Sequence, residues 1–336
     1  MKTDSMTTIF DRGVFGFLKI LMRGAGQVMF QRSAWTGLLF MVGIFWGAYA
    51  AGNGAVAWGA LLGLVVSTAT GFVLNLRAED GEDGLWGFNG ILVGCALPTL
   101  LHPTIWMWLA LMLCAAATTW VRRGLNNIMR QWKINSLTFP FVLCCWVFLL
   151  AAHDMDALSA QASVHHHAHH HLPHTLGTVG AIECWLRGIA QVFLIDSWVT
   201  GVIFIIALGV SNCRAAVWAS LGSALGAATA LVMGAPMSDI AHGLYGFSPT
   251  LTGIALATVF YRPEWRSAAW ATVGIIFTAF FQAAMNRALA PLGIATLTAP
   301  FCFTTWLFLL PMLRLNDDHP DHTSWHSSLK QHLSKR

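Results

Sequence analysis

The sequence predicts an all-α, polytopic membrane protein whose chain consists of two related halves. Hydrophobic residues occupy 56% of the 336 positions and charged residues only 10%, with a mean hydropathy of +0.60. A soluble domain carries roughly 25% charged residues, so this composition excludes one. Long apolar runs recur along almost the whole chain, and three sequence blocks occur twice. We therefore expect about ten transmembrane helices plus two re-entrant pore helices, arranged as two inverted-topology repeats.

The first repeat is expected to cover residues 13–152. It opens with 13–30, whose basic residues predict an amphipathic or tilted helix near the membrane interface. Four apolar runs are predicted to be spans, at 34–50, 54–76, 103–120 and 137–152. Segment 84–101 is glycine-rich, contains Pro98 and is short for a span, so we expect it to enter the membrane and return. The polar stretch 121–136 predicts a cytoplasmic edge.

The second repeat, 181–313, follows the same order. It opens with the weakly apolar segment 181–196, and its glycine- and proline-punctuated run 243–260 is the second re-entrant candidate. Its further predicted spans are 198–211, 215–235, 267–290 and 297–313. A His-rich loop, 153–180, joins the repeats, and a polar C-terminal tail, 314–336, follows them.

The repeated blocks indicate an internal duplication. Residues 21–30 align with 185–194, 84–97 with 243–256, and 137–150 with 297–310, at offsets of 164, 159 and 160. Eight of fourteen positions match in each of the last two blocks. Because five spans per half is an odd number, the second half would start on the opposite membrane face. Inverted repeats of this kind place the permeant site at their interface, near the midplane.

Two pairs of apolar residues within the re-entrant segments are candidate pore walls. Phe88 and Leu92 are spaced i, i+4 and share one helix face, and Phe247 and Leu251 repeat the pair. A single Phe would indicate ordinary packing. Its duplication inside a glycine-rich motif instead favours two faces that line a flat, narrow passage.

Two threonines, Thr138 and Thr298, each stand two residues before a proline in Thr-x-Pro-Phe. A threonine just ahead of such a proline is well placed to cap the following helix. Alternatively, its hydroxyl faces the pore as a hydrogen-bond acceptor. The two interpretations are compatible.

Two glutamines, Gln27 and Gln191, lie on weakly hydrophobic helices beside Val28 and Val192. A buried amide must find hydrogen-bond partners. It could bond to another helix, or it could line a pore where it both donates and accepts. We favour the pore-lining interpretation.

The remaining polar residues indicate little further chemistry. Glu183 and Arg187 are spaced i, i+4 and are expected to pair near the interface. The seven cysteines lie mostly in apolar segments and are expected to be free, buried thiols. The polar first dozen residues predict no cleavable signal peptide. We see no basic stripe for nucleic acid, and no buried carboxylate relay that would couple transport to ions.

The inter-repeat loop carries a histidine cluster formed by His165, His166, His167, His169, His170 and His171. Such a composition is able to sequester a divalent metal. We favour the simpler interpretation of a solvated, variable loop. Clustered histidines titrate near pH 6.5, so a pH-sensitive loop is a further hypothesis.

The duplicated motifs resemble those of the urea transporter family. The motifs are Gly87-Phe88-Asn89-Gly90, Gly246-Phe247-Ser248-Pro249 and the two Thr-x-Pro-Phe sequences. The resemblance covers about residues 15–313, and this compact single unit is most similar to the bacterial members. It implies a homotrimer in lipid, each protomer having its own pore, in the cell inner membrane.

The resemblance also implies roles for the candidate residues. Urea would slide between paired aromatic walls along a ladder of acceptor oxygens. The walls would be Phe88, Leu92, Phe247 and Leu251, with Thr138 and Thr298 at the constriction and Gln27, Val28, Gln191 and Val192 at the two mouths. Phe30 would add an aromatic at its own mouth, although Leu194 occupies the aligned position.

These observations predict a passive, channel-like protein for urea without a cofactor. A hydrophobic slot excludes hydrated ions, since they would lose hydration without repayment. The nearest alternative is a channel for ammonia or ammonium, which would want histidines in its pore. An ion-coupled transporter of another small polar solute would need titratable residues at the midplane. An intramembrane enzyme is the most distant alternative.

Overall fold

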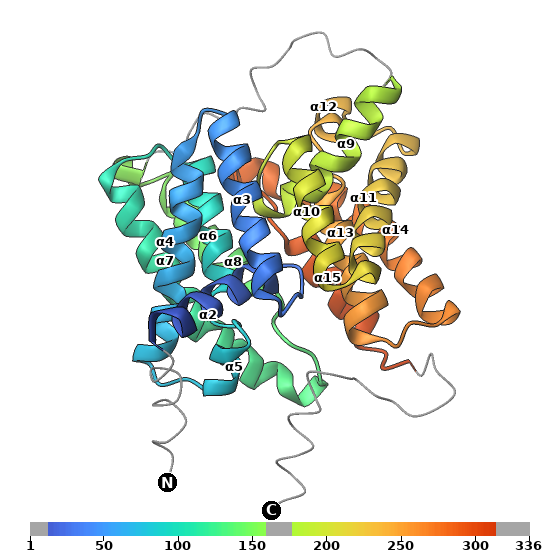
Figure 1. Cartoon of the computed structure of the whole chain (residues 1–336). Coiled ribbons are helices and arrows are strands. Elements are labelled where there is room, and N and C mark those ends of the chain that lie inside the picture. The colour runs from blue at the N-terminus through green and yellow to red at the C-terminus, as the bar shows by residue number, and fades with distance from the viewer. Residues whose placement is uncertain (1–12, 159–176, 314–336) are drawn as a thin grey trace, which may run out of the picture.

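The computed structural model describes residues 13–158 and 177–313 (Figure 1). Within these ranges the regular structure is entirely helical. The histidines predicted to form a metal-binding or pH-sensitive loop lie outside the described residues, as do the C-terminal tail and the first twelve positions.

The first half begins with a helix that lies along one end of the molecule and is followed by longer helices. Its helices are α2 (Gly13–Gln27), α3 (Ala34–Ala50), α4 (Gly54–Val73), α5 (Ala78–Glu82), α6 (Phe88–Leu100), α7 (Ile105–Met129), a short 3-10 turn (Arg130–Trp132) and α8 (Phe139–Ala151). The stretch 121–136, predicted to mark a cytoplasmic edge, begins within α7, which extends to Met129. Arg122 in this part of α7 is buried, and its guanidinium lies 3.4 Å from Asp80.

The second half repeats this order of elements. Its helices are α9 (Thr178–Ala190), a 3-10 turn (Gln191–Phe193), α10 (Trp198–Ser211), α11 (Cys213–Val232), α12 (Met237–Ala241), α13 (Phe247–Ile254), α14 (Trp265–Leu289), a 3-10 turn (Ala290–Leu292) and α15 (Ala299–Leu309). A π-helical stretch, Ala255–Phe260, continues α13. Figure 1 shows the two halves side by side, with α2 and α5 at one end of the molecule and α9 and α12 at the other.

Matching caps start matching helices in the two halves. The Ser33 hydroxyl accepts from the Thr36 N–H at the start of α3, at 3.3 Å. The Ser197 hydroxyl accepts from the Thr200 N–H at the start of α10, at 3.2 Å. Serine is a favoured N-cap residue because its hydroxyl satisfies an N–H that has no partner within the helix.

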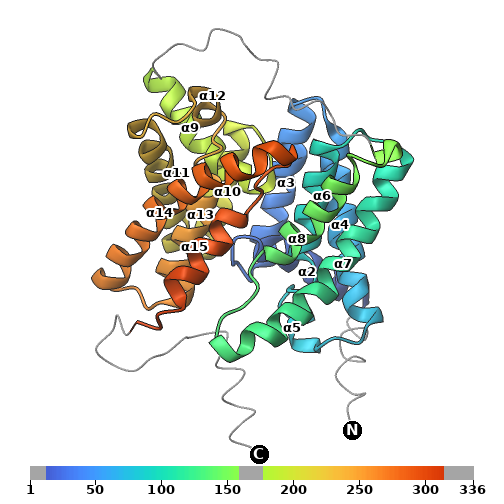
Figure 2. The same cartoon turned by 180° about the vertical axis from the view of Figure 1, so that it is seen from behind.

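The halves contact each other through α3 and α10, and through α8 and α15 (Figure 2). The Thr36 hydroxyl donates to Ala207 O at 3.0 Å, and the Thr200 hydroxyl donates to Gly43 O at 2.9 Å. Gly43 is required there, because an added Cβ would lie 2.7 Å from the Phe204 ring. Hydroxyl groups and small residues at this contact let the two backbones approach closely.

A second reciprocal contact joins α8 and α15 to the loops of the opposite half. The Trp146 indole donates to Ala295 O at 2.9 Å, and the Trp306 indole donates to Asn135 O at 2.9 Å. In each case donor and acceptor positions correspond at an offset of 160. The contact between the halves is therefore made twice, once in each direction.

Four helical segments are long and apolar enough to cross a membrane: Gly54–Val73, Ile105–Trp132, Cys213–Val232 and Trp265–Leu292. Thr178–Phe193 and Trp198–Ser211 meet the same criterion together, although they are bent by 72°. Large apolar side chains such as Trp35, Trp106 and Trp265 face outward. An outward apolar surface suits a hydrocarbon solvent, so the polytopic membrane class is confirmed.

Candidate functional site

Left-handed glycines set the start of the two predicted re-entrant helices. Gly84 has a φ of +82° and Gly243 a φ of +75°, and α6 and α13 begin four residues after them. A Cβ on either glycine would collide with the backbone N–H group of Gly24 or Gly188, on α2 and α9. Only glycine permits both the φ angle and the close approach, so the motif places Phe88 and Phe247 at the first position of their helices.

The predicted apolar wall residues gather in one core. Phe88, Leu92, Phe247 and Leu251 are all buried, and they belong to a single hydrophobic cluster that extends through both halves. Val28 and Val192, the valines predicted beside the mouths, belong to the same cluster. The tertiary structure thus brings together six residues that are scattered over more than 220 positions of the sequence.

The two threonines meet directly. Thr138 Oγ1 lies 2.6 Å from Thr298 Oγ1, and the two residues are only 3% and 2% exposed. Cys302 Sγ lies 3.3 Å from the Thr138 hydroxyl. Both threonines occupy N-cap positions, but neither hydroxyl accepts the capping hydrogen bond. The capping interpretation is therefore wrong, because each hydroxyl is turned towards the opposite half.

An unusual backbone conformation turns the threonines inward. Leu137 and Leu297, which precede them, have φ angles of +50° and +51°. A left-handed conformation costs a non-glycine residue roughly 1–2 kcal/mol. The same conformation occurs at the same position of both halves, so the surrounding packing maintains it twice.

The two glutamines hold the loops ahead of the re-entrant helices. Gln27 Nε2 donates to Asp83 O at 2.8 Å, and Gln191 Nε2 donates to His242 O at 3.0 Å. The donor half of each amide therefore contacts a loop rather than a second helix. Within residues 13–158 and 177–313 neither Oε1 atom accepts a hydrogen bond, which leaves an acceptor at each end of the molecule.

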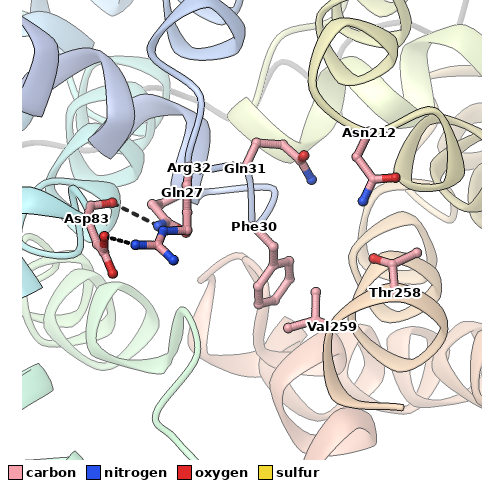
Figure 3. A pocket seen from close by; sticks show the side chains of 8 residues that line it. All are labelled: Gln27, Phe30, Gln31, Arg32, Asp83, Asn212, Thr258 and Val259. Atoms are coloured by element: carbon pink, nitrogen blue, oxygen red, sulfur yellow. Dashed lines mark hydrogen bonds and ion pairs between the residues drawn. The ribbon is translucent and has the colours of Figure 1, made fainter. Parts of the chain in front are cut away.

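A cavity of about 120 Å³ lies beside Gln27. Its lining comes from both halves: Gln27, Phe30, Gln31, Arg32, Asp83, Asn212, Thr258 and Val259. Figure 3 shows the Phe30 ring directed towards Val259. Asn212 lies on the opposite side of Phe30 from Asp83 and Arg32. The sequence analysis missed Gln31, Asn212 and Thr258, because no motif marks residues that meet only across the contact between the halves.

Phe30 packs against aromatic residues of the second half. Its ring lies edge-to-face with Phe260 and Phe301, at centroid distances of 6.3 and 6.1 Å. Leu194, at the aligned position, shares the left-handed backbone of Phe30, with φ angles of +57° and +61°. The two halves therefore share the backbone conformation at this position, but only the first half has an aromatic side chain there.

Each end carries an ion pair beside its glutamine. At the Gln27 end, Arg32 pairs with Asp83. At the Gln191 end, His242 Nδ1 lies 2.6 Å from Asp196 Oδ2, and this hydrogen bond raises the pKa of His242 above its ordinary value of 6.5. The predicted pair of Glu183 with Arg187 is confirmed at 3.1 Å, and Arg187 also lies 3.4 Å from Asp196.

Metal and disulfide chemistry is not supported by the described part of the chain. No group of three His, Cys, Asp or Glu side chains is arranged there to bind a metal. All seven cysteines are free, as predicted, and six of them are buried while Cys213 is exposed. The candidate site consists of buried apolar side chains, hydroxyl groups and amide groups.

Apolar spans that enclose buried neutral polar groups define a multi-pass membrane protein. The sequence profile of the family described as "Urea transporter" matches residues 18–312. Urea transporter 1 of Ovis aries is 29% identical over 307 residues, which cover 88% of this chain and 77% of that protein. Urea transporter 1 of Mus musculus is 28% identical over 312 residues, with the same coverage. The chain belongs to the urea transporter family, which confirms the resemblance seen in its motifs.

Its function is accordingly the transport of urea across the membrane, and it is a transporter rather than an enzyme. The same transporter name recurs for the relative from Capra hircus, which is 29% identical over 307 residues. The predicted permeant is thereby confirmed at the level of the family.

Proposed function

We propose that urea crosses passively, through a slot between two inverted-topology repeats that cover residues 13–152 and 181–313. The observation that carries this proposal is the buried contact of 2.6 Å between the hydroxyls of Thr138 and Thr298. These threonines occupy corresponding positions of the two halves, so their contact marks the axis that would relate the repeats. Inverted repeats place the permeant site on that axis.

The proposed architecture has ten spans and two re-entrant helices. Besides the four long segments, the shorter apolar helices Ala34–Ala50, Phe139–Ala151 and Ala299–Leu309 would cross the membrane with help from neighbouring segments. α2, α9 and α10 would complete the ten. α6 and α13 would be the re-entrant pair, because their backbones are buried by protein on all sides. The placement of α2 and α5 at one end, and of α9 and α12 at the other, supports the inversion.

The proposed roles follow the path of a urea molecule. Urea would enter beside a glutamine acceptor, pass between apolar walls, and exchange hydrogen bonds with the central hydroxyls. The mouths would be Gln27 with Val28 and Phe30, and Gln191 with Val192. The walls would be Phe88, Leu92, Phe247 and Leu251, and the centre would be Thr138 and Thr298.

A neutral slot of this composition suits a neutral, planar amide. The amide hydrogens of urea would exchange water for threonine and glutamine oxygens, and its flat body would lie against the aromatic rings. An ion would lose its hydration shell without equivalent ligands. The wall and centre residues are Phe, Leu and Thr, which carry no titratable group that could couple the flux to protons.

The surroundings of the protein are part of the proposal. We place it in the cell inner membrane as a homotrimer, each protomer having its own pore, as the family resemblance implies. Native mass spectrometry of the detergent-solubilised protein would give the number of chains, and membrane fractionation would give the location.

Stopped-flow light scattering of proteoliposomes tests the slot and the passive mode. We expect fast urea efflux without any Na⁺ or H⁺ gradient, and we expect Phe88→Ala and Thr298→Val to change it. Leu307→Ala is a matched control, because Leu307 faces outward from α15. A requirement for an ion gradient would overturn the passive mode. Unchanged efflux in both slot variants would overturn the slot.

A further inference from the structure

One buried cation lies against a proposed wall of the slot. Arg122, on α7, is only 8% exposed, and its guanidinium carbon lies 5.7 Å from the centroid of the Phe88 ring. Its nearest acidic partner is Asp80 on α5, with an N–O distance of 3.4 Å. The guanidinium therefore lies over the ring of a residue that would form a wall of the slot.

The acidic partner of Arg122 is shared with a second arginine. Asp80 also pairs with Arg77, at 3.5 Å, so that two guanidinium groups contact one carboxylate. Arg77 is exposed, whereas Arg122 is buried. Solvent screens the field of an exposed charge far more than that of a buried charge. Of the two charges, the one beside Phe88 is therefore the less screened.

The second half has no such charge at the corresponding place. An offset of 160 aligns Arg122 with Gln282, which is 2% exposed. The Gln282 amide donates to Asn286 Oδ1 at 2.8 Å and to Thr296 Oγ1 at 2.7 Å. A neutral amide therefore replaces the guanidinium, and the wall formed by Phe88 differs electrostatically from the wall formed by Phe247.

The shape of a slot for urea would not by itself exclude a planar cation of similar size. Guanidinium is planar, is nearly the same size as urea, and carries the same kind of N–H donors. Acceptor oxygens would bind those donors, and aromatic faces attract cations. Rejection of a planar cation must therefore depend on its charge.

We infer that Arg122 is a specificity-determining residue, which makes the slot reject planar cations that resemble urea. This inference rests on the proposed role of Phe88 as a slot wall. Arg122 already interacts with the π system of Phe88, so a second cation that approaches the ring meets repulsion in place of attraction. The repulsion is large because the intervening medium is apolar. Urea is neutral and meets no such barrier.

The experiment compares uptake of radiolabelled urea and guanidinium into proteoliposomes, with the membrane potential held at zero by potassium and valinomycin. In Arg122→Gln, which reproduces the residue of the second half, we expect the guanidinium-to-urea permeability ratio to rise by about tenfold or more. Arg122→Lys retains the charge and should retain the rejection. Arg130→Gln removes one exposed charge at the end of the same helix and is the matched control.

A second variant removes the risk that Arg122→Gln does not fold because Asp80 loses its buried partner. The double variant Arg122→Gln, Asp80→Asn removes both charges together, and the same rise in the ratio is expected. An unchanged ratio in a folded variant would overturn the inference. Equal changes in both fluxes would also overturn it, because they would indicate a packing role. Failure of the slot itself would appear separately, as unchanged urea flux in Phe88→Ala.

Discussion

The two ends of the molecule share their backbone hydrogen bonds and differ in their charges. At one end Gln27 holds the carbonyl of Asp83, and at the other end Gln191 holds the carbonyl of His242. These acceptors correspond at an offset of 159, and the donors at an offset of 164. The hydrogen bonds that hold the loops ahead of α6 and α13 are therefore present in both halves.

The side chains at the same positions form ion pairs of opposite arrangement. Asp83 pairs with Arg32 at the first end, whereas His242 pairs with Asp196 at the second. Arg32 and Asp196 correspond at an offset of 164, so acid and base have exchanged places. The first pair joins an arginine to a carboxylate, whereas the second contains a histidine. The two halves therefore share the backbone hydrogen bonds at their ends but differ in the charged side chains beside them.

The largest expected difference between the halves concerns glycine packing. A Cβ on Gly94 of α6 would overlap the backbone of Gly59 and Ala60 on α4, where no rotamer change gives relief. A Cβ on Gly253, the aligned glycine of α13, would lie 2.8 Å from Trp218 O. We expect Gly94→Ala to destabilise the protein by about 3 kcal/mol or more, and Gly253→Ala by about 1–2 kcal/mol. Thermal unfolding in detergent would measure both.

Gly124→Ala is the control for this pair, because a Cβ at Gly124 meets open space. It should leave the unfolding temperature unchanged or slightly raised. Equal destabilisation by Gly94→Ala and Gly253→Ala would contradict this prediction, because it would mean that α6 and α13 are packed equally tightly.

The next prediction concerns the hydrogen bond between the two central threonines, Thr138 and Thr298. Each single change, Thr138→Val or Thr298→Val, leaves a buried hydroxyl with one partner fewer, and should lower stability by about 1 kcal/mol or more. The double variant removes both hydroxyls and should cost less than the sum of the single changes. Strictly additive unfolding free energies would show that the hydroxyls at 2.6 Å do not interact.

The smallest predicted effect is a pH dependence confined to the second mouth. The hydrogen bond from Asp196, aided by the charges of Asp196 and Asp239, raises the pKa of His242 above 6.5, while burial and Arg187 oppose the shift. A raised pKa means that the folded protein binds the proton more tightly than the unfolded chain. The stabilisation is therefore fully present below about pH 6.5 and is lost as pH rises through the pKa of His242.

This dependence would be measured as the unfolding temperature of wild type minus that of His242→Gln, from pH 5 to 9. The difference should decline as pH rises. Arg32→Gln at the other end of the molecule is the control, because its pair with Asp83 contains no histidine. A difference that rises with pH would contradict the expected sign.

Much of the candidate site could be predicted from the sequence because its motifs occur once in each half of the chain. Phe88 and Leu92 stood out only when Phe247 and Leu251 repeated them at one offset, and the structure buries all four in one cluster. The pairing of Glu183 with Arg187 was also predictable, because a spacing of four residues brings two side chains together on any helix.

Other features escaped prediction because they depend on contacts between distant segments. The burial of Arg122 depends on Asp80, which lies on another helix and has no local signal in the sequence around Arg122. The π-helical stretch Ala255–Phe260 has no local signal, and its counterpart in the first half remains α-helical to Leu100. The threonines were predicted as possible caps from local rules, and only the opposite half explains why their hydroxyls do not cap.

The sequence by itself determined the membrane class and the duplication, and it marked Thr138 and Thr298 as corresponding positions of the two halves. It could do so because hydropathy and repetition are properties of the chain read in order. Only the tertiary structure decided that Asn212 and Thr258 share a cavity with Gln27, and that a buried arginine lies against one phenylalanine wall. Those contacts join residues far apart in the chain, and they form because each half buries its polar groups against specific partners that no local pattern encodes.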